Sequence, residues 1–171
     1  MSDPLTSLLD YLSNNQADPL TYLVIFFLFC VAAAIILPLP VEIGLIWNPG
    51  IFFPIKALVL GLGKASGAIA VFVIGAKVEH AVHRFERWGW FRWLLTKSEA
   101  FTRRFGVFAL YIIMSIPGMI DTIPLYIFSI FNKEGTLIPL RAFALANLLA
   151  GINRAFLIYA IFEIFGVEMF G

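Results

Sequence analysis

The chain has 171 residues, of which 61% are apolar and only 13% are charged, and its formal net charge is +1. An ordinary soluble domain is about a quarter charged, so too few polar side chains remain here to cover a water-exposed surface. This composition excludes a soluble enzyme, a disordered chain and a nucleic-acid-binding domain. It predicts an integral membrane protein with one small domain, and the apolar runs described below predict that its fold is all-α and multi-pass.

The first 18 residues predict a short amphipathic helix at the membrane interface, and residues 19–171 predict a single membrane domain. Four leucines occupy residues 4–13 at helical spacing, but this stretch is too short to cross a bilayer. Residues 20–37 form an uncharged run. As a helix this run would be about 27 Å long, close to one hydrocarbon thickness, so it predicts a first transmembrane helix.

A proline-rich apolar segment at about residues 38–57 predicts a first re-entrant helical hairpin. A continuous helix through Pro38, Pro40 and Pro49 is not credible. The apolar pieces on either side of residues 48–50 would each span about 10 Å as helix, which is less than half a membrane. Broken apolar backbone of this kind needs hydrogen-bond partners inside the protein, and a buried hairpin supplies them.

Residues 57–78 predict a second long helix, and a basic segment overlaps its end at residues 77–104. Gly63 and Gly67 form a G-x-x-x-G step, which favours close packing against another helix. The basic segment holds seven of the twelve lysines and arginines, interleaved with three tryptophans. This pattern is typical of a cytoplasmic interfacial segment. We therefore expect residues 77–104 to be cytoplasmic, and a prokaryotic plasma membrane is the expected location.

Residues 106–131 predict a second re-entrant hairpin. Pro117 and Gly118 break this apolar run into two legs of about 15 Å each. Basic residues flank both ends, and a hairpin that enters the membrane and returns leaves all of them on the cytoplasmic side. Asp121 would lie at the hairpin tip, near the middle of the membrane. Residues 137–162 predict a last long helix, so hairpin followed by helix occurs twice, as in an inverted repeat.

Four stretches of the sequence carry a family resemblance. They are L-P-L-P-V-E at 37–42, G-K-A-S-G-A-I-A-V-F-V-I-G at 63–75, F-T-R-R-F-G at 101–106 with S-I-P-G-M-I-D at 115–121, and R-A-F-A-L-A-N-L-L-A-G-I-N-R-A at 141–155. In this order they resemble the DedA, or VTT-domain (SNARE-associated Golgi), family of integral membrane proteins. The resemblance implies a protein that moves lipids across the bilayer, including phosphate-linked carrier lipids and phospholipids, in some members with a proton dependence.

Three ionisable residues fall within the predicted membrane interior: Glu42, Asp121 and Arg154. Each costs about 2.5–3.5 kcal/mol on insertion scales, so each is a candidate functional residue. If the hairpin tips meet, Glu42 and Asp121 would lie close together, and one of two adjacent buried carboxylates could hold a proton. Arg154 could neutralise a carboxylate or bind a lipid phosphate. A static buried ion pair explains the same residues, and Arg154 could also snorkel to the outer interface.

Lys56, Lys64 and Asn153 are possible contacts for lipid headgroups. Interfacial anchoring is the alternative for the two lysines, and interhelical hydrogen bonding is the alternative for the asparagine. His80 and His83 have the spacing of a metal-binding pair, with Glu79 and Glu86 nearby, but the sequence fixes no third ligand, so we predict neither a metal nor a cofactor. Neither H-E-x-x-H nor G-x-S-x-G occurs, which argues against an enzyme.

The leading hypothesis is a lipid translocase or scramblase that moves a phosphate-bearing headgroup between the two hairpins. The expected partners are membrane lipids, and no nucleic acid is expected. A proton-coupled small-solute transporter and a non-transporting membrane scaffold remain as alternatives. The glycine- and alanine-rich helix faces would also permit a homodimer.

Overall fold

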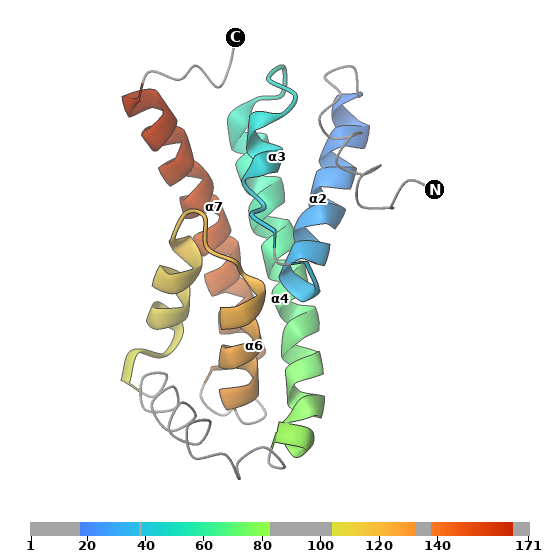
Figure 1. The fold of residues 1–171 in the computed structure, drawn as a ribbon, viewed down its shortest axis with the longest axis vertical. Helices are drawn as coiled ribbons and strands as arrows, with labels where there is room; N and C mark the ends of the chain where they lie inside the picture. Colours follow the sequence, from blue (N-terminus) through green and yellow to red (C-terminus); the bar gives the residue numbers. More distant parts are fainter. Residues whose placement is uncertain (1–17, 38, 83–103, 133–137, 166–171) are drawn as a thin grey trace.

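The computed structural model describes residues 18–37, 39–82, 104–132 and 138–165. Its helices are α2 (Pro19–Ile35), α3 (Ile43–Ile46), α4 (Phe53–Val82), α6 (Thr122–Phe131) and α7 (Leu140–Ile164), with a further helix over Arg104–Ser115 (Figure 1). These ranges contain no strand, so the predicted all-α class is confirmed for them. The predicted N-terminal interfacial helix, Pro38 and most of the basic segment lie outside the described residues.

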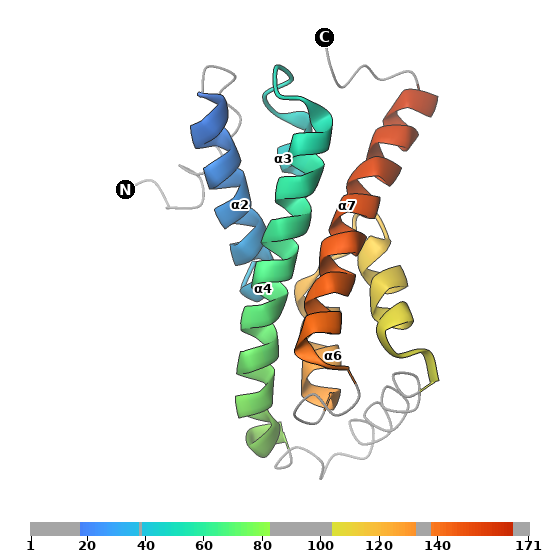
Figure 2. The same ribbon diagram turned by 180° about the vertical axis from the view of Figure 1, so that it is seen from behind.

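The long helices α4 and α7 run antiparallel along the length of the molecule (Figures 1 and 2). Phe53–Gly75 and Leu140–Ile164 are each long and apolar enough to cross a membrane. They confirm the long helices predicted at 57–78 and 137–162. We call the end with the start of α4 and the end of α7 the upper end, and the opposite end the lower end.

Small residues bring α4 close to its neighbours on two sides. A Cβ atom on Gly151 of α7 would lie 2.8 Å from the Cα atom of Gly61, so the two long helices nearly touch through their backbones. On the side facing α2, a Cβ on Gly63 or on Gly67 would lie 3.1 Å from a backbone carbonyl oxygen. The G-x-x-x-G step therefore serves tight helix packing.

α2 and α3 form a pair of segments, the upper pair, that starts at the upper end and returns to it. α2 runs parallel to α4, because Gly63 faces Cys30 and Gly67 faces Ala34. The last turn of α2 therefore lies beside the middle of α4. The chain then reverses and rises through α3, where the Tyr22 hydroxyl donates to the Gly44 carbonyl oxygen (Figure 1).

This path differs from the predicted one, in which residues 20–37 cross the membrane and residues 48–50 form the hairpin tip. The reversal lies instead in the proline-containing segment between α2 and α3, because proline cannot continue a helix. The turn between α3 and α4 lies at the upper end (Figure 1). Asn48, which has a φ of 53°, is part of this turn. Lys56 Nζ ties this turn to α4 by donating to the carbonyl oxygens of Leu45 at 3.1 Å and Trp47 at 2.9 Å.

The helix Arg104–Ser115 and α6 form a second pair, the lower pair, which starts at the lower end and returns to it (Figure 2). The reversal falls at Pro117 and Gly118, as predicted. Gly118 has a φ of 73° and the Met119 amide donates to the Ile116 carbonyl oxygen at 3.4 Å. Proline followed by a left-handed glycine is the pattern of a type II turn.

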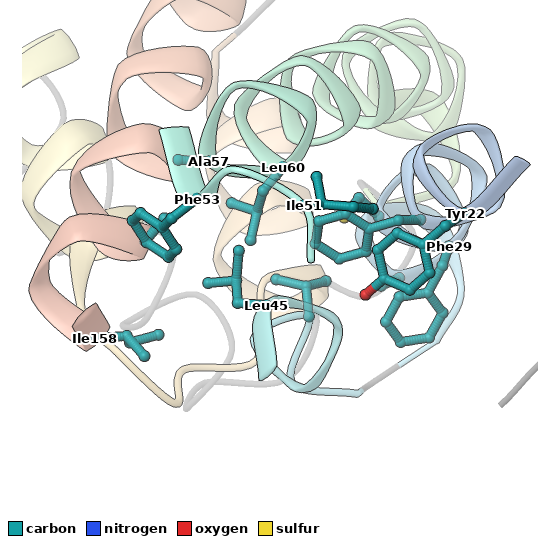
Figure 3. Close-up of a cluster of buried hydrophobic side chains, with 13 residues drawn as sticks. Tyr22, Phe29, Leu45, Ile51, Phe53, Ala57, Leu60 and Ile158 are labelled. Carbon is teal, nitrogen blue, oxygen red and sulfur yellow. The ribbon is translucent and has the colours of Figure 1, made fainter. Parts of the chain in front are cut away.

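The tips of the two pairs touch at mid-height. The Thr122 hydroxyl of α6 donates to the Ala33 carbonyl oxygen at 2.9 Å, and the Tyr126 hydroxyl donates to the Ile35 carbonyl oxygen at 3.2 Å. These bonds satisfy carbonyl groups that the end of α2 leaves free. Apolar clusters fill the space on either side of this contact, and Figure 3 shows the upper one, where Tyr22 lies with other buried side chains between α2, α3, α4 and α7.

Candidate functional site: a buried charge cluster

Four charged side chains meet where the two tips lie against α4 and α7. Glu42, Lys64, Asp121 and Arg154 form this charge cluster. Lys64 and Arg154 have an exposed fraction of 0%, Asp121 of 4% and Glu42 of 8%. Lys64 is the middle residue of the candidate span Phe53–Gly75, and Arg154 lies near the middle of α7. Both cations are therefore buried halfway along helices that could cross a membrane.

A single carboxylate oxygen holds both cations. Asp121 Oδ1 accepts from Lys64 Nζ at 3.0 Å and from Arg154 Nη1 at 2.7 Å. The second terminal nitrogen of Arg154 pairs with Glu42 Oε1 and donates to the Met119 carbonyl oxygen at 2.5 Å. The guanidinium group thus connects the tip of the upper pair to the tip of the lower pair.

Backbone groups of the lower tip complete the cluster. The Gly118 amide donates to Glu42 Oε1 at 2.9 Å, and Lys64 Nζ donates to the Met114 carbonyl oxygen at 3.0 Å. The positive φ of Gly118 presents this amide to the carboxylate. The type II turn therefore fixes the lower tip and also supplies one of its hydrogen-bond donors.

Asp121 is oriented by the cations, although it precedes the first residue of α6. An aspartate at this position commonly caps its helix by accepting from backbone amides. Asp18 does so at the start of α2, where its Oδ2 accepts from the Thr21 amide at 3.2 Å. Asp121 makes no such bond to α6. Its side chain turns instead to Lys64 and Arg154.

With all four groups ionised, the cluster contains two positive and two negative charges and is neutral. Moving one charge from water into a protein interior costs several kcal/mol, and only close, well-placed partners offset that cost. Here every charge has an opposite charge within salt-bridge distance. Neutralising any one side chain would leave a net charge in the centre of the fold.

Two polar atoms of the cluster are buried without a hydrogen-bond partner among the described residues. They are Glu42 Oε2, which can accept, and Arg154 Nε, which can donate. A native interior leaves few such atoms unsatisfied. The cluster can therefore take one further donor and one further acceptor, or exchange a carboxylate on Arg154 for another anion.

The structure brings the three predicted site residues, Glu42, Asp121 and Arg154, into one cluster. The alternative in which Arg154 snorkels to an interface is wrong, because its side chain is fully buried. Lys64, predicted only as a headgroup contact or an anchor, is a member of the cluster. Its position well inside the predicted 57–78 helix was a signal for burial, because a lysine there cannot reach either helix end.

The other predicted contacts lie away from the cluster. Lys56 of α4 is fully buried against the upper pair, and Asn153 is half-buried on the helix position next to Arg154. Of the predicted hairpin breakers, Pro117 and Gly118 form the lower reversal, Pro40 lies in the upper reversal and Pro49 lies in the turn at the upper end (Figure 1).

Comparisons with protein-family models, with curated proteins and with solved structures find no match for this chain.

Proposed function

We propose that this protein is a membrane lipid translocase or scramblase of the DedA/VTT type, which moves a phosphate-bearing headgroup past the charge cluster. The observation that carries the proposal is the burial of two cations and two carboxylates halfway along α4 and α7. Ionisable groups at membrane depth are costly and typically mark a transport path. In transporters with broken helices, the site lies near the midplane where the broken elements meet.

In the proposed membrane arrangement, α4 and α7 cross the bilayer and the two pairs re-enter it from opposite faces. Each pair followed by a long helix would then form one half of an inverted repeat. The basic segment 77–104 follows the apolar part of α4, which supports a cytoplasmic lower end. Residues 1–55 and 155–171 contain no lysine or arginine, which supports a non-cytoplasmic upper end.

The chemistry of the cluster supports a phosphate as the group that moves. A guanidinium group binds phosphate through paired hydrogen bonds, and a lysine adds a compact positive charge. A phosphate oxygen could replace Asp121 Oδ1, the one atom that contacts both cations. The carboxylate would then act as a resting counterion that keeps the empty site neutral. To leave the two cations, the Asp121 carboxylate would have to take up a proton or become hydrated. The first of these would make transport depend on protons.

The test is a headgroup-flipping assay with fluorescent phospholipids in liposomes that contain the purified protein. The double variant Glu42→Gln and Asp121→Asn removes both negative charges and changes little in side-chain shape. We expect its flipping rate to fall at least tenfold, which corresponds to about 1.4 kcal/mol of lost stabilisation. The matched control, Asp18→Asn with Glu163→Gln, makes the same chemical changes at exposed positions and should flip at the wild-type rate. Wild-type flipping in the cluster variant would contradict the proposal.

The two alternative functions predict different results in the same preparation. A static scaffold would show lower thermal stability in the cluster variant but no change in any flux. A proton-coupled small-solute transporter would show solute uptake that requires a proton gradient and no movement of labelled lipid. Thermal unfolding, solute uptake and lipid flipping measured on the same samples separate these cases.

A further inference from the structure

An apolar pocket of about 520 Å³ opens near the upper end, away from the charge cluster. Residues 49–54, which lead into α4, line one side, and Phe156 and Tyr159 of α7 line the other. The Phe53 ring lies 5.6 Å from the Phe156 ring and 4.9 Å from the Tyr159 ring, measured between centroids. These three rings pack against one another and form one wall of the pocket. None of the lining residues is charged.

The pocket lies between the start of α4 and the last third of α7. The two helices approach through their backbones at Gly61 and Gly151, and they diverge from there toward the upper end in both views (Figures 1 and 2). Aromatic side chains bridge the wider gap, and the pocket opens beside them.

The mouth of the pocket is continuous with the apolar outer surface. Phe52 on its rim is 70% exposed and Phe156 is 46% exposed. Ile55 and Leu157, which are also exposed, extend this surface along α4 and α7. Both candidate membrane spans include residues of the pocket wall. In the proposed membrane arrangement, the pocket therefore opens sideways toward lipid.

We propose that this pocket binds one acyl chain of a membrane lipid, an inference that rests on the proposed membrane arrangement. Lipid tails are the apolar groups present at this depth, and the lining offers no charge to recognise a headgroup. A tail in the bilayer is already out of water, so its gain on entering the pocket comes from dispersion contacts with the aromatic walls. The packed aromatic rings favour one fixed site over a general coating of lipid.

The test uses liposomes of phosphatidylcholine that carries a photoactivatable diazirine in one acyl chain. After illumination, peptide mapping by mass spectrometry locates the adducts. We expect adducts to concentrate on residues 49–54 and 156–159, well above the level at Leu145, which is 53% exposed on α7. Adducts that follow exposed apolar area alone would overturn the proposal.

A variant that adds bulk at the pocket lining makes the test specific. A Cβ atom on Gly50 would meet only Asn48 Oδ1, at 3.8 Å, so Gly50→Leu has room within the fold. We expect it to reduce pocket adducts several-fold, whereas Leu145→Phe, which adds bulk at a surface outside the pocket, should leave them unchanged. Unchanged adducts in Gly50→Leu would overturn the proposal. Cross-links from the pocket lining to a second copy of the chain would also overturn it.

The flipping assay in the same liposomes separates this inference from the proposed function. Concentrated adducts without lipid flipping would refute the translocase and leave the acyl-chain site in place. Flipping without concentrated adducts would refute the acyl-chain site alone. Asp18→Asn should retain the wild-type adduct pattern, because Asp18 is exposed and does not line the pocket.

Discussion

Replacing Asp121 should destabilise the fold strongly, because one of its oxygens holds both buried cations. Asp121→Asn keeps the size of the side chain, so it adds little cavity cost. It leaves Lys64 and Arg154 opposed only by Glu42, and hence one uncompensated positive charge in the interior. Breaking a buried ion pair on one side costs about 3–5 kcal/mol. We expect a loss of that size in the free energy of unfolding.

A double-mutant cycle with Lys64 tests whether the cost comes from charge. Lys64→Met alone leaves one uncompensated negative charge and should also cost about 3–5 kcal/mol. The double variant Lys64→Met with Asp121→Asn restores neutrality and keeps the pair between Arg154 and Glu42. It should be more stable than either single variant, with a coupling energy of about 3 kcal/mol or more.

The assay is unfolding by a denaturing detergent in mixed micelles, followed by circular dichroism. Asp18→Asn is the matched control, since Asp18 is exposed and asparagine caps a helix as well as aspartate does. Its free energy of unfolding should stay within about 0.5 kcal/mol of wild type. A loss below about 1 kcal/mol for Asp121→Asn would refute the reasoning. A double variant whose loss equals the sum of the two single losses would also refute it.

Three further predictions concern the turn, the helix crossing and the membrane topology. Gly118→Ala should lower the free energy of unfolding by about 1–2 kcal/mol in the same assay, because alanine disfavours the positive φ of 73°. The control Gly50→Ala should leave the free energy of unfolding unchanged, because Gly50 has open space around it and no positive φ. Gly61→Val should separate α4 from α7 and lower the unfolding midpoint sharply; a wild-type midpoint would contradict the close crossing. Cysteines introduced at Gly50 and Phe165 should both react with an impermeant reagent from the same face of the membrane, and a cysteine introduced at Arg104 should react from the other face. Labelling of the Gly50 and Phe165 positions from opposite faces would refute re-entry of the lower pair.

Local sequence signals were sufficient for several features of the fold. The uninterrupted apolar stretches predicted α4 and α7, because a long run without proline can satisfy its own backbone hydrogen bonds in an apolar environment by forming a helix. Pro117 with Gly118 predicted the lower reversal, because this dipeptide matches a type II turn. The position of Asp121 just after that turn then placed a carboxylate at the tip. Each of these inferences depends on residues that are neighbours in the chain.

The path of the upper pair depends on packing between distant residues, and sequence alone did not predict it. Residues 20–37 are long enough to cross a membrane, so length gave no reason to expect a reversal halfway. The structure fixes the level of α2 through Gly63 and Gly67, which hold Cys30 and Ala34 beside the middle of α4. The role of Lys64 was missed for a related reason, since its partner Asp121 lies 57 residues away.

The composition of the cluster itself argues for more than stability. An apolar replacement of a buried ion pair is often neutral or stabilising by about 1–4 kcal/mol, so a fold that needed only stability could do without these charges. The arrangement also leaves Glu42 Oε2 and Arg154 Nε buried without partners among the described residues. A purely structural network would gain by satisfying both atoms. A neutral cluster with two such atoms is what the proposed function expects, since in that proposal the site exchanges its own carboxylate for an incoming anion.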